Sequence, residues 1–415
     1  MARRSRRLRS AHPLVPAWIT ALVVVVAVAA VAGCGGGNQP TAILVGSYLG
    51  LTGHSATFGQ STQNGIVMAF DEVNAAGGIA GKTLKAIIED DQGRPEEAAT
   101  AVRKLISQDG VIAVLGDVPS SNSLAAAPIC QEAHVPMITP SSTNPRVTET
   151  GDYIFRVCFI DPFQGTVMAK FAAEHKGLKK AGILRDVRSD YSVGLADFFI
   201  ATFKELGGTI VADEAYSQGD TDFRAQLTTL KAAGPDAIFV PGYYNDVGLV
   251  VRQAREIGLT IPILGGDGWD SPELLALGGP ALANTFFSNH YSTEDQSPTV
   301  QNFIQAYEKR FGAKPDALAA LGYDAAQCLA AALREIATAD PAQFVRLVGP
   351  VPSDAAAREA RTAARERLRS VLAATKDLRG VTGSITMDSH RNAVKPAVVL
   401  AVSQEGYRYV TTIEP

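Results

Sequence analysis

From residue 42 onward, short β-branched runs alternate with longer segments whose apolar positions recur at helical spacing. Four runs predict strands: 42–48, 82–90, 111–116 and 136–139. Three segments between them predict helices: 59–76, 94–108 and 121–133. Strands that alternate with helices of this length indicate βαβ units and a parallel sheet covered on both faces.

A second cycle of the same kind follows an irregular stretch at 152–165. Further strands are predicted at 181–186, 209–217, 236–244 and 261–267. Further helices are predicted at 166–177, 191–207, 222–234 and 247–258. Two successive βα sets of similar size indicate two similar lobes.

The last third of the chain predicts helices within 299–335 and 353–374, then three strands around 384–388, 396–402 and 408–413. The second βα set cannot complete itself, and the first is left short of helices. We therefore expect the chain to cross between the lobes more than once.

The N-terminus differs from the rest of the chain. Five arginines precede an apolar run from Ile19 to Ala32, which is short for a membrane span and typical of a signal segment. The run ends in "VAGC", which resembles a bacterial lipoprotein lipobox and predicts a signal peptide over 1–33 and lipidation of Cys34. An uncleaved membrane anchor is the alternative. Residues 34–41 are polar and glycine-rich and predict a tether, so both interpretations place the body outside the cytoplasm, tied to a membrane.

Charge and cysteine content narrow the function. Without residues 1–33 the chain carries 33 basic and 42 acidic residues, and this acidic balance argues against a nucleic-acid partner. No CxxC or Cys/His cluster indicates a metal site. In an oxidising compartment two of the remaining cysteines could pair, and Cys130 with Cys158 is the favoured disulfide because these two are close in sequence; Cys328 is left over.

Two predicted strands of the first lobe end in hydroxyl-rich turns. In open α/β sheets, ligands bind beyond the carboxyl ends of strands, where loops lead into helices. Ser120 to Ser123 precede a predicted helix, whose free N–H groups and dipole attract an anion. A plain N-cap needs only one such residue and is favoured for Ser121 or Asn122 taken alone, whereas Ser120 is favoured as a contact for a ligand carboxylate.

The turn after the next strand repeats this chemistry in "MITPSSTNP". Ser141, Ser142 and Thr143 lie between Pro140 and Pro145, which restrict the loop. A nucleophilic serine would need a positioned base, and no GxSxG elbow is present. We therefore expect ligand contacts here rather than catalysis.

The second predicted lobe offers a complementary charge. Asp267 follows a strand directly, among glycines, where a carboxylate could pair with an ammonium group; a turn Asp bonded to its own backbone is the alternative. A metal site with Asp270 is weaker because no further oxygen ligands cluster nearby. Tyr191 and Tyr243 follow strands of the same lobe and could wall a pocket, or else pack in the core.

Several segments together resemble the branched-chain amino-acid-binding lipoproteins, which are type I periplasmic binding proteins that deliver ligand to an ABC importer. The segments are "GLTGHSATFGQSTQNGIVMAFDEVNAAGGIAG", "PMITPSSTNP", "YIFRVCFIDPFQG" and "GGDGWDSPELL". The resemblance implies an α/β fold of two Rossmann-like lobes with parallel sheets, joined by a three-crossover hinge. It also implies lobe 1 over 42–161 plus 290–379, and lobe 2 over 162–289 plus 380–415.

Matched residue by residue, the resemblance implies a set of ligand contacts. Ser120 and Thr143 would bind the α-carboxylate, and the Ser141 carbonyl with Asp267 would bind the α-ammonium. Tyr191 and Tyr243 would close over the amino acid, and Phe58 would line the side-chain pocket. Ser121 and Ser142 join the set as neighbours in the two turns.

The chain also departs from the family pattern. Several members have Glu where Asp267 stands, and Leu318 has small neighbours where some members carry bulkier residues. The family disulfide is missing, with Pro119 at one of its positions, so a Cys130–Cys158 bridge would be a substitute.

We therefore expect an extracytoplasmic, membrane-anchored solute-binding lipoprotein that is not an enzyme and uses no cofactor or metal. The expected ligand is an amino acid, in first place Leu, Ile or Val, and the expected partners are the permease subunits of an ABC importer. We expect a monomer. Three alternatives remain: an amide, urea or amine-free carboxylate as ligand; a sensor that acts through a partner protein; and a hydrolase that uses Ser120 or Ser141.

Overall fold

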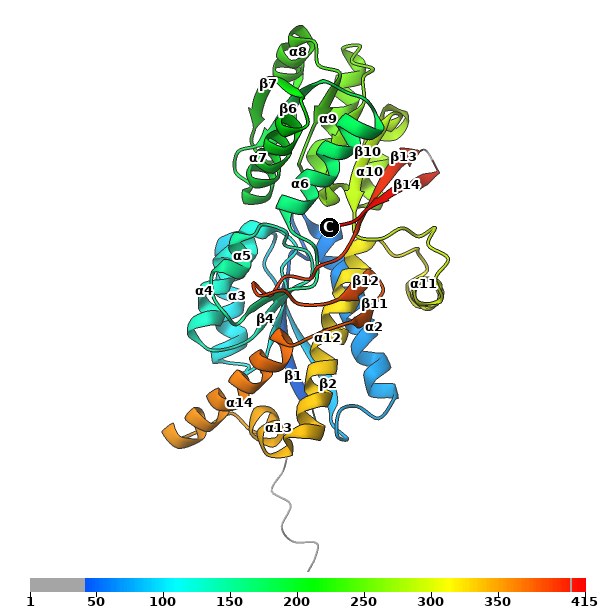
Figure 1. The fold of residues 1–415 in the computed structure, drawn as a ribbon. Helices are drawn as coiled ribbons and strands as arrows, with labels where there is room; N and C mark the ends of the chain where they lie inside the picture. Colours follow the sequence, from blue (N-terminus) through cyan, green and yellow to red (C-terminus); the bar gives the residue numbers. More distant parts are fainter. Residues whose placement is uncertain (1–41, 404) are drawn as a thin grey trace, which may run out of the picture. The chain divides into compact units, whose positions relative to one another are not determined.

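The computed structural model describes residues 42–403 and 405–415. The signal segment, Cys34 and the tether lie outside these residues. Within the described part the chain forms two α/β lobes, each built on its own sheet, and a separate two-stranded hairpin (Figure 1). No helix in residues 42–403 or 405–415 combines the length and apolar character needed to cross a bilayer.

The first lobe contains a five-stranded sheet in the order β2-β1-β3-β4-β5. Its strands are β1 (Ala42–Leu49), β2 (Thr83–Asp90), β3 (Val114–Leu115), β4 (Met137–Thr139) and β5 (Ile154–Arg156). Every pairing is parallel, with Gly46 opposite both Ile87 in β2 and Val114 in β3. A parallel sheet requires crossover helices, and these cover both of its faces.

Helices from two distant parts of the chain cover this sheet, and α2 packs along α12 (Figure 1). The early helices are α2 (Ala56–Ala75), α3 (Pro95–Ser107), α4 (Ser120–Glu132) and α5 (Arg146–Glu149). The later helices are α12 (Ala317–Ala339), α13 (Pro341–Val348) and α14 (Ala355–Ala373). The helix α11 (Pro298–Phe311) follows β10 and precedes α12 in the sequence. It packs through Val300, Phe303 and Tyr307 into a smaller apolar cluster.

The second lobe contains a seven-stranded sheet in the order β14-β13-β10-β9-β8-β6-β7. Its strands are β6 (Lys180–Asp186), β7 (Thr209–Tyr216), β8 (Ala237–Phe239), β9 (Ile263–Gly265), β10 (Thr285–Asn289), β13 (Ala397–Ser403) and β14 (Gly406–Ile413). The strands β6 to β10 pair in parallel, and β13 and β14 are antiparallel additions at one edge.

The helical segments of the second lobe lie between these strands in the chain. They are α6 (Asp161–Lys170), η1 (Phe171–His175), α7 (Asp190–Glu205), α8 (Arg224–Ala233), α9 (Tyr244–Glu256), η2 (Asp267–Trp269), α10 (Pro272–Gly278) and η3 (Gly279–Leu282). Ser271 accepts a hydrogen bond from the N–H of Glu273 and caps α10, and Pro272 suits the first helical turn.

The two lobes share one strand order. β2-β1-β3-β4-β5 in the first lobe corresponds to β7-β6-β8-β9-β10 in the second. Because each sheet is doubly wound in this order, the carboxyl ends of corresponding strands present equivalent loops. The prediction of two Rossmann-like lobes with parallel sheets is confirmed.

The chain passes between the lobes three times: after β5, after β10 and before β13. The hairpin of β11 (Leu378–Gly380) and β12 (Gly383–Ile385) is bound to the first lobe, because the N–H groups of Val381 and Thr382 donate to Asp324 in α12. The third crossing therefore comes later than the expected boundary at residue 380. The five-residue strand β10, which precedes the second crossing, was not predicted from the sequence.

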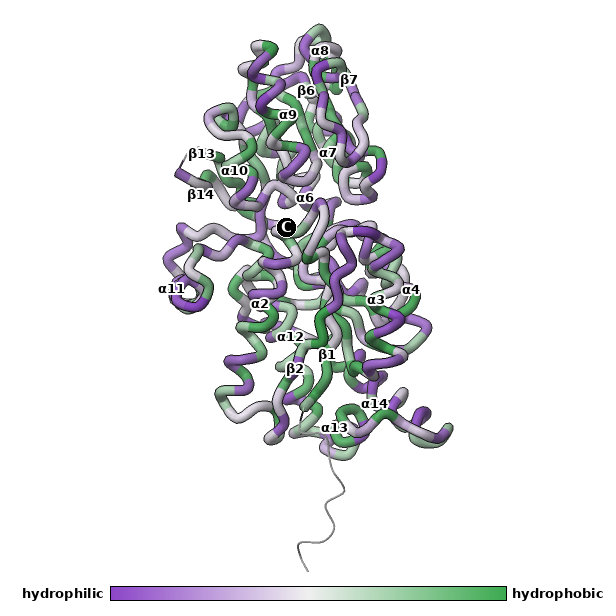
Figure 2. Tube along the Cα trace, turned by 180° about the vertical axis from the view of Figure 1, so that it is seen from behind, coloured by the Kyte–Doolittle hydropathy of each residue, from purple (hydrophilic) through white to green (hydrophobic). Residues whose placement is uncertain are grey.

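Alternate residues of each strand point to opposite faces of the sheet, and this corrects the predicted disulfide. Cys130, Cys158 and Cys328 are all free and buried. Cys130 in α4 packs with Met137 and Ile154 on one face of the first sheet, whereas Cys158 packs with Ile138 and Phe155 on the other. The sheet separates the two sulfur atoms, so the expected Cys130–Cys158 bridge does not form. The apolar strands that divide the two cores are visible in Figure 2, with β1 in green.

Candidate functional site

A cavity lies where the carboxyl ends of the strands of both lobes meet. Ten residues line it: Phe58, Val118, Ser120, Ser141, Thr143, Tyr191, Tyr243, Asp267, Gly268 and Leu318. Loops and first helical turns after β1, β3 and β4 supply the first lobe's share, and those after β6, β8 and β9 supply the second lobe's share. Leu318 comes from the first turn of α12. The placement is the one that open α/β sheets favour for ligands.

The cavity is narrow in this structure. Its empty space is about 260 Å³, but the centre of a water molecule has only about 10 Å³ of it to occupy. A water molecule needs roughly that much, so the gap holds about one. A larger solute enters only when the two lobes move apart.

Ser120 and Ser141 bring hydroxyl groups to the cavity from two turns of the first lobe. Ser120 is the first residue of α4, which begins without a side-chain cap. Its Oγ accepts a hydrogen bond from the N–H of Asn144 at 3.3 Å, which ties the two turns together. The Ser141 Oγ is buried and has no hydrogen-bond partner. An unpaired buried hydroxyl at a cavity wall is a group that a ligand can satisfy.

Ser142 does not line the cavity. Its Oγ lies 2.9 and 3.0 Å from the carbonyl oxygens of Asp117 and Val118, and 2.8 Å from the Ser123 Oγ. Ser142 therefore joins the two turns from behind, and the prediction that it contacts ligand is not supported. The buried Arg156 completes this support by donating to the carbonyl oxygens of Ser142 and Asn144.

Ser121 also points elsewhere. Its Oγ donates to the Asp190 carboxylate at 2.9 Å and accepts from the Asp190 N–H at 3.1 Å. Asp190 begins α7 in the second lobe, so this is a contact between lobes. Asn144 and Arg146 make two more contacts to Asp190, at 2.8 and 3.0 Å. Ser121 is thus neither a cavity residue nor the simple cap that was its alternative.

Asp267 is the acid of the cavity and is held by two neighbours, Gln164 and His290, that were not predicted from the sequence. Its Oδ1 accepts from the Gln164 side chain at 3.0 Å, and its Oδ2 lies 2.9 Å from His290 Nε2. The side-chain amide oxygen of Gln164, Oε1, in turn accepts from the Asp267 N–H at 2.8 Å and from the Ser288 hydroxyl at 2.9 Å. The carboxylate is therefore fixed from both sides, which exceeds a turn Asp bonded only to its own backbone.

The groups around Asp267 have shifted ionisation. Burial lowers the pKa of His290, although its bond to Asp267 opposes that shift. Burial raises the pKa of Asp161 to about 8, with Asp267 contributing in the same direction and the Thr143 hydroxyl opposing. Near neutral pH both His290 and Asp161 are therefore mainly uncharged.

Aromatic rings close the remaining sides. Tyr191 and Tyr243 stack with centroids 5.3 Å apart, and Phe58 meets Tyr243 edge-on at 5.7 Å. The Tyr191 hydroxyl accepts from the N–H of Gly268 at 3.2 Å. A Cβ on Gly268 would lie 2.7 Å from the Gly242 carbonyl oxygen, so glycine is needed for this close packing.

Seven of the nine predicted site residues thus meet at the cavity: Phe58, Ser120, Ser141, Thr143, Tyr191, Tyr243 and Asp267. Gln164 and His290 were missed. Gln164 stands in the family-like segment "YIFRVCFIDPFQG", which could have indicated its place, whereas His290 follows β10, a strand that was not predicted, so nothing in the sequence marked it.

The arrangement suits binding better than catalysis. In residues 42–403 and 405–415, neither Ser120 nor Ser141 makes a side-chain hydrogen bond to a histidine or carboxylate that could activate it. The same residues contain no group of three or more His, Cys, Asp or Glu side chains that could hold a metal ion. What the site does offer is hydroxyls and a helix N-terminus on one side and a fixed carboxylate on the other.

The two-lobed fold, with its site between the carboxyl ends of two doubly wound sheets, defines a solute-binding protein of the type I periplasmic class. The family model described as "Periplasmic binding protein" matches residues 42–406. The chain therefore belongs to the periplasmic binding protein family.

Individual relatives agree. The chain is 33% identical to Leu/Ile/Val-binding protein homolog 1 of Brucella suis over 75% of this chain and 83% of that protein. The structure of the leucine binding protein LivK from Thermotoga maritima superposes with a TM-score of 0.81 at 37% identity, covering 90% of this chain and 99% of LivK. The branched-chain amino acid binding protein LivJ of Streptococcus pneumoniae, in complex with isoleucine, gives 0.80 at 34% identity, covering 90% and 100%.

Proposed function

We propose that the protein captures an amino acid, in first place leucine, isoleucine or valine, between its lobes and delivers it to an ABC importer. The observation that carries the proposal is the opposite chemistry of the two cavity walls. Ser120, Ser141 and Thr143 offer hydrogen bonds beside a helix N-terminus, and Asp267 offers a fixed negative charge across from them. An amino-acid zwitterion carries the matching groups on one carbon atom.

In this proposal each wall binds one end of the zwitterion. The Ser120 and Thr143 hydroxyls bind the α-carboxylate, because the start of α4 favours an anion there. Asp267, with the Ser141 carbonyl, binds the α-ammonium, and Gln164 and His290 keep its carboxylate aimed at the cavity. Tyr191 and Tyr243 exclude water from these charged contacts.

The rest of the lining supports a branched aliphatic side chain. Phe58, Val118 and Leu318 are apolar and come from the first lobe. They provide no hydrogen-bonding atom on their side chains, so a polar ligand side chain would lose its contacts with water without replacing them. The relatives described above are named for binding leucine, isoleucine or valine, or were crystallised with isoleucine, and they support the same ligand class.

The setting of the protein follows from its N-terminus. We propose that residues 1–33 are removed, that Cys34 is lipidated, and that the body acts as an anchored monomer outside the cytoplasm, without enzymatic activity. Residues 34–41 then give the lobes reach from the membrane to the importer's permease subunits.

One alternative ligand class has a specific observation in its favour. The carboxylate of Asp267 already has two partners, Gln164 and His290. A carboxylate without an amine would bind the hydroxyls of the first lobe and leave Asp267 to its present partners. The same site would also serve a ligand sensor that acts through a partner protein. Loss of amino-acid uptake on deletion of the protein would count against the sensor.

A thermal-shift screen with the twenty amino acids, urea and simple amides tests the proposal. A ligand at a hundred times its dissociation constant adds about 2.7 kcal/mol to the free energy of unfolding. We expect Leu, Ile and Val to give the largest shifts. Larger shifts with urea or an amide than with any amino acid would overturn it.

A further inference from the structure

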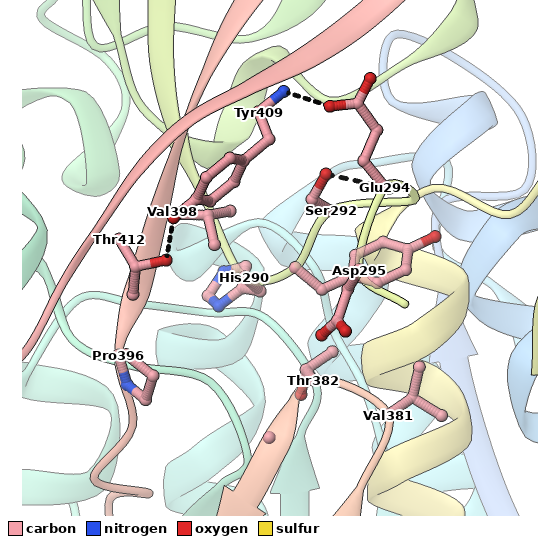
Figure 3. Close-up of a pocket in the computed structure, with 12 residues that line it drawn as sticks. His290, Ser292, Glu294, Asp295, Val381, Thr382, Pro396, Val398, Tyr409 and Thr412 are labelled. Atoms are coloured by element: carbon pink, nitrogen blue, oxygen red, sulfur yellow. Dashed lines mark hydrogen bonds between the residues drawn. The ribbon is translucent and has the colours of Figure 1, made fainter. Parts of the chain in front are cut away.

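A second and roomier cavity lies at the hinge (Figure 3). The centre of a water molecule has about 470 Å³ to occupy in this cavity, against about 10 Å³ in the cavity between the lobes. Its lining residues are His290, Tyr291, Ser292, Glu294, Asp295, Val381, Thr382, Gly383, Pro396, Val398, Tyr409 and Thr412. None of them lines the cavity between the lobes. The hinge cavity is within the size range of small-molecule pockets, roughly 300–1,000 Å³.

The walls of the hinge cavity come from two of the three crossings. His290 to Asp295 belong to the chain that leaves β10, and Pro396 lies just before β13. Val381 to Gly383 belong to the hairpin fixed to the first lobe, whereas Tyr409 and Thr412 stand on β14 of the second lobe. A change in the angle between the lobes therefore changes the shape of this cavity.

Most polar side chains that line this cavity already have a hydrogen-bond or ion-pair partner. The Thr382 hydroxyl donates to Asp324 and accepts from Lys395, and the hydroxyls of Tyr409 and Thr412 bond each other at 2.9 Å. Glu294 is matched by Arg408 at 3.1 Å. Asp295 accepts one bond through Oδ1, from the N–H of Ser297, and no cation is paired with it among the described residues.

His290 connects this cavity with the first one. Its ring lies among the lining side chains in Figure 3, is fully buried, and bonds Asp267 through Nε2. A carboxylate accepts hydrogen bonds only, so Nε2 carries the proton and Nδ1 is an acceptor in the neutral ring. Nδ1 is buried and has no partner. A donor that enters this cavity could satisfy this buried acceptor.

We propose that the hinge cavity is a second binding site, for a small organic ammonium ion with an aliphatic body. The ammonium group donates to the Asp295 carboxylate, and its remaining hydrogens face the acceptor side of His290. The aliphatic body packs against Val381, Pro396 and Val398. Because the ligand contacts parts fixed to different lobes, it favours one lobe angle over others and changes the affinity of the cavity between the lobes.

A matched set of probes tests the site: cyclohexylamine, cyclohexanol and cyclohexanecarboxylate share one ring and differ in charge. Calorimetric titrations use the full protein, first alone and then saturated with the amino acid that the thermal screen identifies. We expect one cyclohexylamine per chain in both cases, weaker binding of the alcohol, and none of the carboxylate. Loss of amine binding on saturation would mean that the amine enters the cavity between the lobes, and would overturn the proposal.

Two variants locate the amine. Asp295→Asn removes the charge at an exposed position and should weaken cyclohexylamine binding by about tenfold, which is about 1.4 kcal/mol. Thr412→Trp fills the cavity from an exposed strand position and should abolish binding. Glu174→Gln, an exposed acid in η1, is the matched control and should change nothing. Unchanged amine binding in both cavity variants would overturn the site.

The coupling has its own readout. If cyclohexylamine changes the affinity for the amino acid by some factor, the amino acid changes the affinity for cyclohexylamine by the same factor. We expect this reciprocal change in the wild type and its absence in Thr412→Trp. Independent binding of the two ligands would overturn the coupling. The amine titration on the protein alone does not depend on the proposed function, so the two proposals fail separately.

Discussion

Asp267 concentrates the chemistry of the site on one side chain. Gln164 and His290 hold its two oxygens at 3.0 and 2.9 Å, so the carboxylate keeps its direction when the cavity is empty. A charge fixed in advance loses little freedom when a ligand arrives, and this preorganisation increases affinity.

The substitution Asp267→Asn should therefore weaken leucine binding strongly. The amide keeps the shape but leaves the ammonium without a counter-charge, and loss of one partner of a buried charged pair costs about 2–5 kcal/mol. The expected loss of affinity lies between roughly 30-fold and several-thousand-fold. Glu273→Gln, an exposed acid six residues further along, is the control. Equal affinities of Asp267→Asn and wild type would remove Asp267 from the site.

Asp161 makes stability depend on pH in a defined direction. Burial raises its pKa from 3.8 to about 8, so the folded state holds a proton that the unfolded state releases between these values. The stability from this group is complete below pH 3.8 and is lost as the pH rises to about 8. Relative to Asp161→Asn, the wild type should lose free energy of unfolding from pH 5 to pH 8, by at most about 1.4 kcal/mol per pH unit.

Denaturant unfolding of both proteins across this range measures the difference. His290 has a lowered pKa and loses stability in the opposite direction, as the pH falls, but its contribution is present in both proteins and cancels. A difference that stays constant with pH would show that Asp161 is ionised in the fold.

At the scale of elements, the sequence could show which turns matter but not which way their side chains point. Strand ends and hydroxyl runs placed Ser120, Ser141 and Thr143 at the correct edge of the sheet. Ser142 stands between two cavity residues and yet faces the Asp117 carbonyl oxygen, because the direction of each loop side chain depends on local backbone angles. The predicted Cys130–Cys158 disulfide was wrong for a similar reason, because the distance between two cysteines in the sequence does not determine which face of the sheet each one reaches.

Long-range partners were also beyond the pattern. Gln164 lies 103 residues from Asp267, and no local period relates them. Their contact depends on the tertiary fold, because α6 packs against β10 and β10 lies next to β9 in the sheet. β10 itself is short and lies before an irregular segment, so its apolar residues did not stand out from a loop.

Ser142→Ala should destabilise the first lobe. The hydroxyl joins the turn after β4 to the turn after β3, and its loss leaves buried carbonyl oxygens with fewer donors, at about 1–3 kcal/mol. Chemical unfolding measures this loss. Ser121→Ala is the comparison, because its hydroxyl bonds only across the lobes to Asp190, and it should leave unfolding nearly unchanged. The reverse order of the two variants would contradict the assigned roles.

At the scale of the molecule, contacts at both sides of the cavity hold the lobes together. On one side Ser121, Asn144 and Arg146 meet Asp190; on the other, Asn245 donates to the His54 carbonyl oxygen and Thr57 contacts Ser271 at 3.1 Å. Because the cavity is narrow, these contacts must break before a ligand enters and form again when the lobes close around it. Hinge closure of this kind traps the ligand.

Asp190→Ala should therefore speed ligand release. The Arg146 pair is exposed and contributes at most about 1 kcal/mol, and the Ser121 bond adds about as much, so we expect release to be roughly 5- to 30-fold faster. Stopped-flow measurement of leucine dissociation checks this. Asp197 lies on the same helix as Asp190, but it pairs with Arg185 in β6 of its own lobe. Asp197→Ala should therefore leave the rate unchanged. Equal rates for the two variants would show that Asp190 does not hold the closed state.

The central claim is that the cavity binds both charged ends of an amino acid. The most direct test is calorimetric titration of the protein with leucine and with 4-methylpentanoate, which is leucine without its amine. We predict one leucine per chain, and binding of 4-methylpentanoate weaker by about a hundredfold or more, because Asp267 then faces no ammonium. Equal or tighter binding of 4-methylpentanoate would contradict the account.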